Sequence, residues 1–200
     1  MCSELHDKSL NPYIDNNEIY NQWAKNYDKY VDSLEYNGPR NIVSFFKEKF
    51  ETKNKFKILD FGCGTGKVGE ELRKQLNNKD FYLEGIDISA KMIDIAISKK
   101  VYNKNTLVDL TKTIYNEKYD YILSSGVFLE GHVSIKNINR LFDLLKKNGL
   151  LIFTIRTSFK DNNYIDFKKY VLENKKFNDV YITDIEYLKN VSCNLVCLTK

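Results

Sequence analysis

The stretch that decides the fold is Ile58-Leu59-Asp60-Phe61-Gly62-Cys63-Gly64-Thr65-Gly66. A short apolar run comes first, three glycines follow at alternate positions, and an amphipathic segment begins directly after them. Alternate glycines let the backbone turn sharply and let a ligand approach without interference from Cβ atoms. A helix that starts behind such a turn leaves its first amide groups free to donate hydrogen bonds. The pattern therefore predicts a strand, a nucleotide-binding turn and a helix, in that order.

Strands alternate with helices along the rest of the chain. Further strands are predicted near residues 81–86, 106–108, 119–123, 150–155, 180–188 and 192–198. Helices are predicted over residues 67–76, 90–99, 135–146 and 164–172. This alternation predicts right-handed crossovers and an α/β fold with a Rossmann-like, doubly wound, mostly parallel sheet. The last two strands are joined by a short turn, so we expect the final strand to be antiparallel.

The N-terminal part has two patterns. Residues 1–17 are polar and unpatterned, and we expect a loose N-terminal arm there. From Glu18 to Leu34 apolar and aromatic residues recur at steps of three and four, which predicts one helix, and a second helix is predicted over residues 40–50. A chain of 200 residues is too short for two ordinary domains. We therefore expect a single domain over residues 18–200, with residues 18–50 as a helical cap.

Composition excludes several classes of function. The formal net charge of +4 is only mildly basic, which does not support nucleic acid as a partner. The four cysteines show no C-x-x-C pair and there are only two histidines, so no metal site is expected. No apolar run reaches 18 residues and no leader precedes the first helix, which predicts a cytoplasmic protein without a membrane partner. The oligomeric state stays open.

The glycine spacing distinguishes between ligands. A dinucleotide fingerprint needs a glycine at the sixth place of the turn, and counting from Gly62 that place is Lys67. Asp60 would moreover repel a pyrophosphate. An acid followed by G-x-G-x-G resembles instead the first motif of class I S-adenosylmethionine-dependent methyltransferases. The resemblance implies S-adenosyl-L-methionine as the cofactor, which carries no phosphate.

The same resemblance implies roles for individual residues. Asp60 would receive the ammonium group of the cofactor directly or through water, and Asp87 would accept hydrogen bonds from the ribose hydroxyls, although it could also merely precede the helix cap Ser89. The remaining cofactor-binding candidates are backbone positions of the turn, apolar contacts to adenine, and groups that meet its exocyclic amine and ring: Gly62, Cys63, Gly64, Ile88, Met92, Asp109 and Leu110. We expect no nucleophilic role for Cys63, because methyl transfer from a sulfonium needs no covalent enzyme intermediate.

Two further segments narrow the family. Ile19 to Asp28, taken with Tyr119 to Phe128 and Gly131-His132-Val133, resembles the methyltransferase-like protein 27 group. That resemblance extends from about Tyr20 to Phe153. It implies that Tyr27 on the entry helix contacts the cofactor and that Ser124 lies beside its methionine part. His132 is a candidate catalytic base, since its ordinary pKa lies near neutral pH.

These observations predict direct in-line transfer of a methyl group to an unidentified acceptor, most simply a small molecule. The acceptor atom is left open among oxygen, nitrogen, carbon and sulfur. One alternative is a cofactor-binding protein without catalysis that acts through partners. A protein or RNA methyltransferase is a further alternative, and a nicotinamide oxidoreductase is disfavoured by Lys67.

Overall fold

The computed structural model describes residues 2–49, 55–157, 162–173 and 176–200. Its centre is a seven-stranded sheet with the strand order β3-β2-β1-β4-β5-β7-β6. The strands are β1 (Phe56–Phe61), β2 (Phe81–Asp87), β3 (Lys104–Leu107), β4 (Tyr119–Phe128), β5 (Leu145–Arg156), β6 (Asp179–Leu188) and β7 (Val191–Thr199). Strand β7 pairs antiparallel with β5 and β6, and the pairs from β3 to β5 are parallel. The predicted Rossmann-like sheet with a final antiparallel strand is confirmed.

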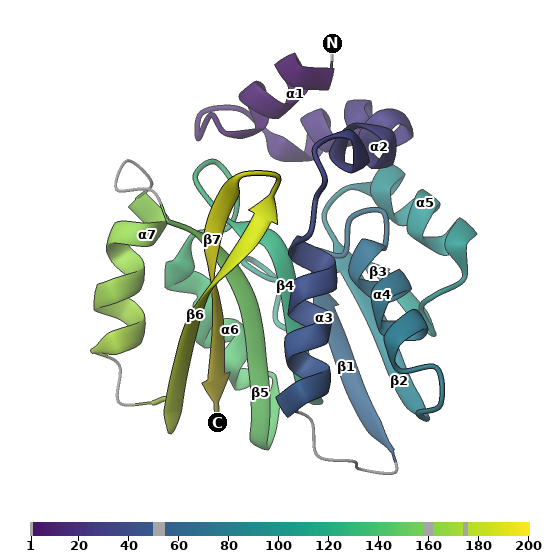
Figure 1. Cartoon of the computed structure of the whole chain (residues 1–200). Helices are drawn as coiled ribbons and strands as arrows, with labels where there is room; N and C mark the ends of the chain where they lie inside the picture. The colour runs from purple at the N-terminus through teal and green to yellow at the C-terminus, as the bar shows by residue number, and fades with distance from the viewer. Residues whose placement is uncertain (1, 50–54, 158–161, 174–175) are drawn as a thin grey trace.

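Helices surround the sheet on its two faces and at one edge (Figure 1). They are α1 (Cys2–Ser9), α2 (Asn16–Ser33), α3 (Gly38–Lys49), α4 (Lys67–Gln75), α5 (Ala90–Lys99), a 3-10 turn (Ile135–Asn137), α6 (Ile138–Asp143), α7 (Asn162–Phe167) and a π-helical turn (Lys168–Leu172). Helices α1 and α2 lie across the upper edge of the sheet, whereas β7 ends at the lower edge beside the C-terminus. The parallel strands therefore end beneath α1 and α2, which we call the cap. Of the two helices predicted as a cap over residues 18–50, α2 lies at this edge, whereas α3 packs on a face of the sheet.

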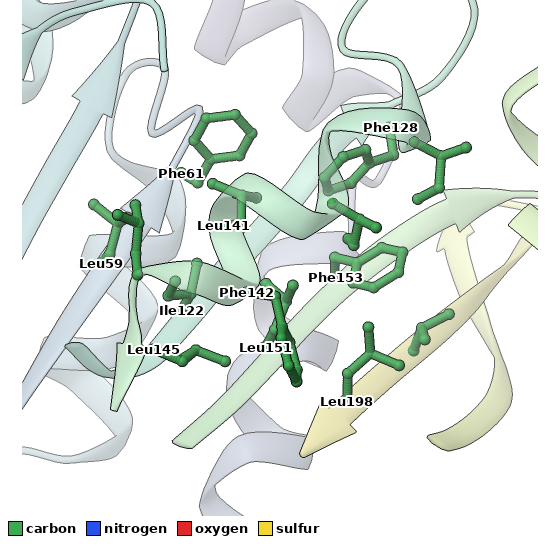
Figure 2. Packing of buried hydrophobic residues seen from close by; sticks show 14 of the residues in the cluster. Leu59, Phe61, Ile122, Phe128, Leu141, Phe142, Leu145, Leu151, Phe153 and Leu198 are labelled. Atoms are coloured by element: carbon green, nitrogen blue, oxygen red, sulfur yellow. The ribbon is translucent and has the colours of Figure 1, made fainter. Parts of the chain in front are cut away.

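Two apolar cores pack on opposite faces of the sheet. Adjacent residues of β5 show the division, because Leu151 belongs to one core and Ile152 to the other, and both are fully buried. One core joins the strands to α6, to α7 and to the π-helical turn that follows α7. Figure 2 shows Leu141 and Phe142 of α6 packed over side chains of the strands. The other core joins the strands to α3 and α4. Burial on both faces explains the continuous apolar run in β5.

The structure differs from the sequence prediction in the N-terminal arm. Residues Cys2–Ser9 form helix α1, which packs against α2. The imidazole of His6 stacks on the indole of Trp23 at 5.9 Å between ring centroids, and the side-chain amide of Asn16 donates to the Ser9 carbonyl over 3.1 Å. A short polar helix is marginal by itself, so these tertiary contacts stabilise a conformation that the local pattern does not reveal.

A second difference concerns the helix predicted over residues 135–146. Helix α6 ends at Asp143, and β5 begins at Leu145, which pairs with Tyr119. Asn148 adopts a left-handed φ of 62° inside β5, where the register against β4 shifts. Asn148-Gly149, predicted to stop a helix, is thus an irregularity within a strand, because pairing with β4 outweighs the local helix propensity. The last residue of the helix predicted over 40–50, Phe50, lies outside the described residues.

Candidate functional site

The glycine turn joins β1 to α4 at the upper edge of the sheet. The amides of Gly62 and Cys63 both donate to the carbonyl of Ile86 at the end of β2, over 2.8 and 2.9 Å. The left-handed φ of Gly64, +52°, is one that glycine adopts without strain. A Cβ atom built on Gly64 would meet nothing within 4 Å. The turn is therefore held to the neighbouring strand while its outer side faces open space.

Asp87 ends β2 directly beside this turn. Its Oδ2 accepts from the Gly64 amide over 2.8 Å, and its Oδ1 accepts from the Ser89 amide over 2.9 Å. Burial raises the pKa of Asp87, while these backbone hydrogen bonds oppose the shift. Each carboxylate oxygen has a second lone pair, so both can still accept from a hydroxyl group. Both interpretations made from the sequence fit this geometry, since Ser89 also caps α5 through a bond from the Met92 amide.

A cleft of about 450 Å³ opens above the turn, within the range of ~300 to 1,000 Å³ typical of small-molecule sites. We call it the large cleft. Nine of the twelve residues singled out from the sequence line it, namely Tyr27, Gly62, Gly64, Asp87, Ile88, Met92, Asp109, Leu110 and His132. Side chains from the ends of β1, β2 and the segment after β3 are thus brought together at one edge, as parallel strands predict.

Asp109 is held by its own turn within this cleft. Its Oδ1 accepts from both the amide and the hydroxyl of Thr111, over 2.9 and 2.6 Å, and Lys112 pairs with Oδ2 at 3.1 Å. Burial raises the pKa of Asp109, but the bonds from Thr111 and Lys112 outweigh it and leave the pKa below its ordinary value. Asp109 is therefore an ionised acceptor at neutral pH.

Asp60 does not line the large cleft. It is fully buried; its Oδ2 accepts from the Tyr102 hydroxyl over 2.6 Å, and its Oδ1 is buried without a partner among the described residues. Burial raises the pKa of Asp60 to about 7, with the Tyr102 bond lowering it and the Asp87 charge adding to the rise. The structure thus places this carboxyl behind the glycine turn.

Cys63 and Ser124 also lie outside the lining of the large cleft. The Cys63 thiol is buried, and burial raises its pKa well above the ordinary value. The Ser124 hydroxyl is buried and donates to the Phe61 carbonyl over 3.0 Å. Successive side chains of a strand point in opposite directions. The next residue, Ser125, consequently faces the cleft in place of Ser124.

Sequence reasoning missed lining residues from two segments. The stretch between α1 and α2 contributes Ile14 and Asp15, the first residue of α2 contributes Asn16, and the loop after β4 contributes Val133 and Ser134. The side-chain oxygen of Asp15 accepts from the Asn17 amide and caps α2. An Asp before an amphipathic run is a helix-start signal, which predicts the cap but not its place over the sheet.

A second, smaller space lies under the cap and has a volume of about 120 Å³. We call it the aromatic cavity, because tyrosines, Trp23 and the two histidines supply much of its wall. Its ring-bearing lining residues are His6, Tyr20, Trp23, Tyr27, Tyr30, Tyr36, Phe128, His132 and Tyr187. Four residues line both spaces: Tyr20, Tyr27, Gly126 and His132. These four residues, which we call the junction, form part of the wall of both spaces.

Among the titratable side chains of the junction, His132 has the pKa that lies nearest to neutral pH. Its Nδ1 lies 3.1 Å from the Glu130 carbonyl and its Nε2 lies 2.7 Å from the Tyr20 hydroxyl. A carbonyl only accepts, so Nδ1 carries the hydrogen and Nε2 accepts from Tyr20. Burial lowers the pKa of His132 to about 4, with the Glu130 bond opposing and the His6 charge adding to the shift. At neutral pH His132 is an uncharged acceptor whose lone pair faces a tyrosine.

Helix α2 is fastened to the turn below it. Asp28 accepts from the Thr65 hydroxyl over 2.5 Å and pairs with Lys99 at 2.7 Å. Asn21 accepts from the Ser89 hydroxyl over 2.8 Å. Tyr20, Trp23 and Tyr27 lie on one face of the helix with ring centroids 5.0 to 6.1 Å apart. The periodicity correctly predicts this aromatic face of the helix, and the structure places the face over the strand ends.

No group of three or more His, Cys, Asp or Glu side chains in the described ranges is arranged to hold a metal ion. Within the same ranges, no helix combines the length and apolar character needed to cross a membrane.

Comparison with known proteins gives relatives by sequence. A family model described as a methyltransferase domain matches residues 19–190. The chain is 30% identical over 150 residues to methyltransferase-like protein 27 of Homo sapiens, covering 73% of this chain and 60% of that protein. It is 28% identical over 137 residues to malonyl-[acyl-carrier protein] O-methyltransferase of Bacillus cereus, covering 68% and 50%. The chain spans 45% to 62% of the length of eight curated relatives.

Solved structures share the fold. Magnesium protoporphyrin IX methyltransferase from Synechocystis PCC 6803, solved with bound SAM, superposes with a TM-score of 0.67 at 16% identity, covering 95% of this chain and 99% of that chain. Plantazolicin methyltransferase, in complex with SAH, superposes with a TM-score of 0.60 at 17% identity, covering 98% and 99%. The class I methyltransferase fold predicted from the sequence is confirmed.

Proposed function

Because the chain belongs to the methyltransferase domain family, we propose that it is an enzyme that transfers a methyl group from S-adenosylmethionine to a small-molecule acceptor. The observation that carries the proposal is the junction, where Tyr20, Tyr27, Gly126 and His132 line both the large cleft and the aromatic cavity. A cofactor in the cleft and an acceptor in the cavity would face each other there. When bound, S-adenosylmethionine supplies an electrophilic methyl group on a positively charged sulfur.

The residues of the large cleft suit this cofactor. The open space outside Gly64 admits a ligand against the turn, and Asp87 keeps lone pairs for ribose hydroxyls. Ile88 and Met92 line the same cleft and offer apolar surface for the adenine ring, with Asp109 as an acceptor for its amine. Asp60 lies behind the turn, so of the two routes expected from the sequence the one through water fits its position.

The chain would contribute to transfer mainly by orienting the acceptor and excluding water. Both Tyr20 and His132 line the junction and are hydrogen-bonded to each other. We assign to this pair the task of receiving a proton from an acceptor that carries one, with the Tyr20 hydroxyl passing it to Nε2 of His132. The lowered pKa of His132 makes the imidazole a weak base, so the pair serves acceptors that lose their proton readily.

Binding of the cofactor is tested by calorimetric titration with S-adenosylmethionine and S-adenosylhomocysteine. We expect Asp87→Asn to weaken both by about 1.5 to 3 kcal/mol, the scale of hydrogen bonds to a charged group. Asp94→Asn is the matched control, since this carboxylate on α5 is 66% exposed. Unchanged affinity in Asp87→Asn would show that the ribose assignment is wrong.

Turnover is tested separately, by incubating the protein with isotopically labelled S-adenosylmethionine and fractionated metabolite pools. We expect labelled product from at least one pool, and less product with Asp87→Asn at the same subsaturating cofactor concentration. Tight binding of S-adenosylhomocysteine with no labelled product from any pool would favour the non-catalytic alternative. Label transferred only to protein or RNA fractions would favour a macromolecular acceptor.

A further inference from the structure

The aromatic cavity has an uneven chemical character. Its lining includes hydroxyls, an indole N–H and the guanidinium of Arg156, but no Asp or Glu side chain. Both histidines in its wall have pKa values lowered by burial, so they are uncharged at neutral pH. Arg156 is consequently the only charged side chain that lines the cavity within the described part of the chain. A ligand there meets one positive charge and several hydrogen-bond donors.

Trp23 supplies a donor that has no acceptor. The side chain is 3% exposed, and its Nε1 is buried without a hydrogen-bond partner among the described residues. An indole N–H can only donate, and leaving such a group unsatisfied costs about 1 to 3 kcal/mol. Trp23 lines the aromatic cavity but not the large cleft. The missing acceptor is therefore expected from whatever fills the aromatic cavity.

Arg156 supplies the charge in the wall of the same cavity. It ends β5, its side chain is exposed, and no carboxylate of the described residues pairs with it. Burial lowers the pKa of His6, whose ring stacks on Trp23; the Asp7 charge opposes this shift and the Arg156 charge adds to it. Like Trp23, Arg156 lines the aromatic cavity and not the large cleft. Trp23 also packs against two rings of the junction, with its ring centroid 5.8 Å from that of Tyr20 and 5.0 Å from that of Tyr27.

We propose that the methyl acceptor carries a carboxylate, which Arg156 and the indole N–H of Trp23 bind in the aromatic cavity. This inference rests on the proposed function and adds the class of acceptor. The two donors match the two oxygens of a carboxylate, and an Arg guanidinium binds that group with strong charge-assisted hydrogen bonds. The rest of the ligand lies among the rings of Tyr27, Tyr36 and Tyr187, which favours an apolar or aromatic body.

Other ligand classes fit less well. Aromatic faces attract an ammonium group, but such a group would meet the like charge of Arg156 in the cavity wall, and it offers no acceptor to Trp23. A phosphate dianion has three terminal oxygens and more charge than one guanidinium balances. The volume of about 120 Å³ far exceeds the ~10 to 15 Å³ that one water needs, so the cavity is large enough for a small organic group.

The experiment uses the single tryptophan of the chain. The protein is saturated with S-adenosylhomocysteine to fill the large cleft and titrated with benzoate, benzamide or benzylamine, following the one indole N–H cross-peak by NMR. We expect benzoate to bind roughly tenfold or more tightly than the neutral and cationic probes and to shift the indole resonance in the direction of a stronger hydrogen bond. Preference for benzylamine or benzamide, or an indole resonance that does not move with benzoate, would overturn the proposal.

Substitutions of Arg156 test whether the carboxylate of benzoate binds to this side chain. Arg156→Gln is expected to remove the preference for benzoate, Arg156→Lys to restore part of it, and Arg40→Gln, an exposed arginine of α3 outside both spaces, to leave it unchanged. Full benzoate affinity in Arg156→Gln would contradict the assignment. Calorimetry with S-adenosylhomocysteine separates the two levels of inference. If the protein binds S-adenosylhomocysteine but shows no preference for benzoate, only the proposed acceptor class is refuted. If the protein does not bind S-adenosylhomocysteine, the proposed function is refuted.

Discussion

The imidazole of His132 lies between the Tyr20 hydroxyl and the Glu130 carbonyl, both within hydrogen-bond distance of its ring nitrogens. Neither partner carries a negative charge, and burial disfavours the protonated ring, so the pKa falls to about 4. The same physics separates Asp87 from Asp109. At Asp87 burial outweighs the backbone hydrogen bonds that oppose it, whereas at Asp109 the hydrogen bonds from Thr111 and Lys112, together with the Lys112 charge, overcome burial. The charge that each group carries at this site therefore depends on how burial is balanced by its hydrogen bonds and neighbouring charges.

The depressed pKa of His132 predicts a pH-dependent stability. Between its ordinary pKa of 6.5 and about 4, the unfolded chain binds a proton that the folded chain excludes, so the folded state loses stability as the pH falls through this window. The loss is at most about 3 kcal/mol. In His132→Gln this part of the pH dependence should be absent, as measured by urea denaturation at a series of pH values. His6 titrates in both proteins and cancels in the comparison; parallel curves would refute the assignment.

Gly64 makes a second prediction at the scale of one residue. Its φ of +52° disfavours any Cβ, so Gly64→Ala should lower the free energy of unfolding by about 1 to 2 kcal/mol. The added methyl group also enters the open side of the turn, and we expect a loss of S-adenosylhomocysteine affinity beyond what the stability change explains. Asn148→Ala, at a φ of 62° in β5, is the control for left-handed strain without a change in the cleft. Equal affinity in Gly64→Ala and wild type would exclude close approach of the ligand to this turn.

At the scale of elements, helix α2 joins two functions. One face carries the rings that line the aromatic cavity, and Asp28 on the same helix contacts Thr65 of the turn and Lys99 of α5. Tyr27 lines both spaces. A displacement of α2 would therefore open the cavity and loosen the turn together, which suits an element that covers bound ligands.

The contacts of Asp28 predict how firmly α2 is held. Asp28→Asn keeps the shape of the side chain and removes its charge, and we expect faster hydrogen exchange in α2 with unchanged exchange in β4. S-Adenosylhomocysteine affinity should fall by about 1 kcal/mol, the scale of one net hydrogen bond. Asp32→Asn is the control, because its pair with Lys67 is 65% exposed on the Asp32 side and such pairs contribute little. Equal exchange rates in both variants would show that Asp28 does not hold the helix.

At the scale of the whole molecule, one sheet separates two cores. Leu151 and Ile152 are neighbours in β5 whose side chains enter opposite cores. Strand β5 lies between β4 and β7, so both cores depend on the same central strands. This arrangement favours one cooperative unit, which remains a prediction made from the length of the chain.

Paired substitutions test this cooperativity. Leu151→Ala and Ile152→Ala should each lower the free energy of unfolding by about 2 to 5 kcal/mol, since both side chains are fully buried. In each variant, far-ultraviolet circular dichroism and Trp23 fluorescence should report the same midpoint. A variant in which the two signals change at different denaturant concentrations would show that the faces unfold separately.

The spacing of residues along the sequence was enough to predict much of the fold and part of the site. The alternation of strands and helices, the glycine turn after β1 and the acids after β2 and β3 were readable because strand and helix periods are set by neighbouring residues. The parallel arrangement then brought Asp87, Asp109 and the turn to one edge. The same logic correctly predicted the aromatic face of the cap helix.

Tertiary structure alone decided the rest. The folding of α1, the early end of α6 and the position of Asp60 behind the turn depend on long-range packing, which local propensity does not encode. The aromatic cavity joins residues far apart in the chain, such as Tyr36 and Tyr187, whose hydroxyls lie 3.4 Å apart. A buried donor like the Trp23 indole is recognisable only when all its neighbours are known. Covalent neighbours set the period of an element, but the partners of each side chain are set by the packing of the whole fold.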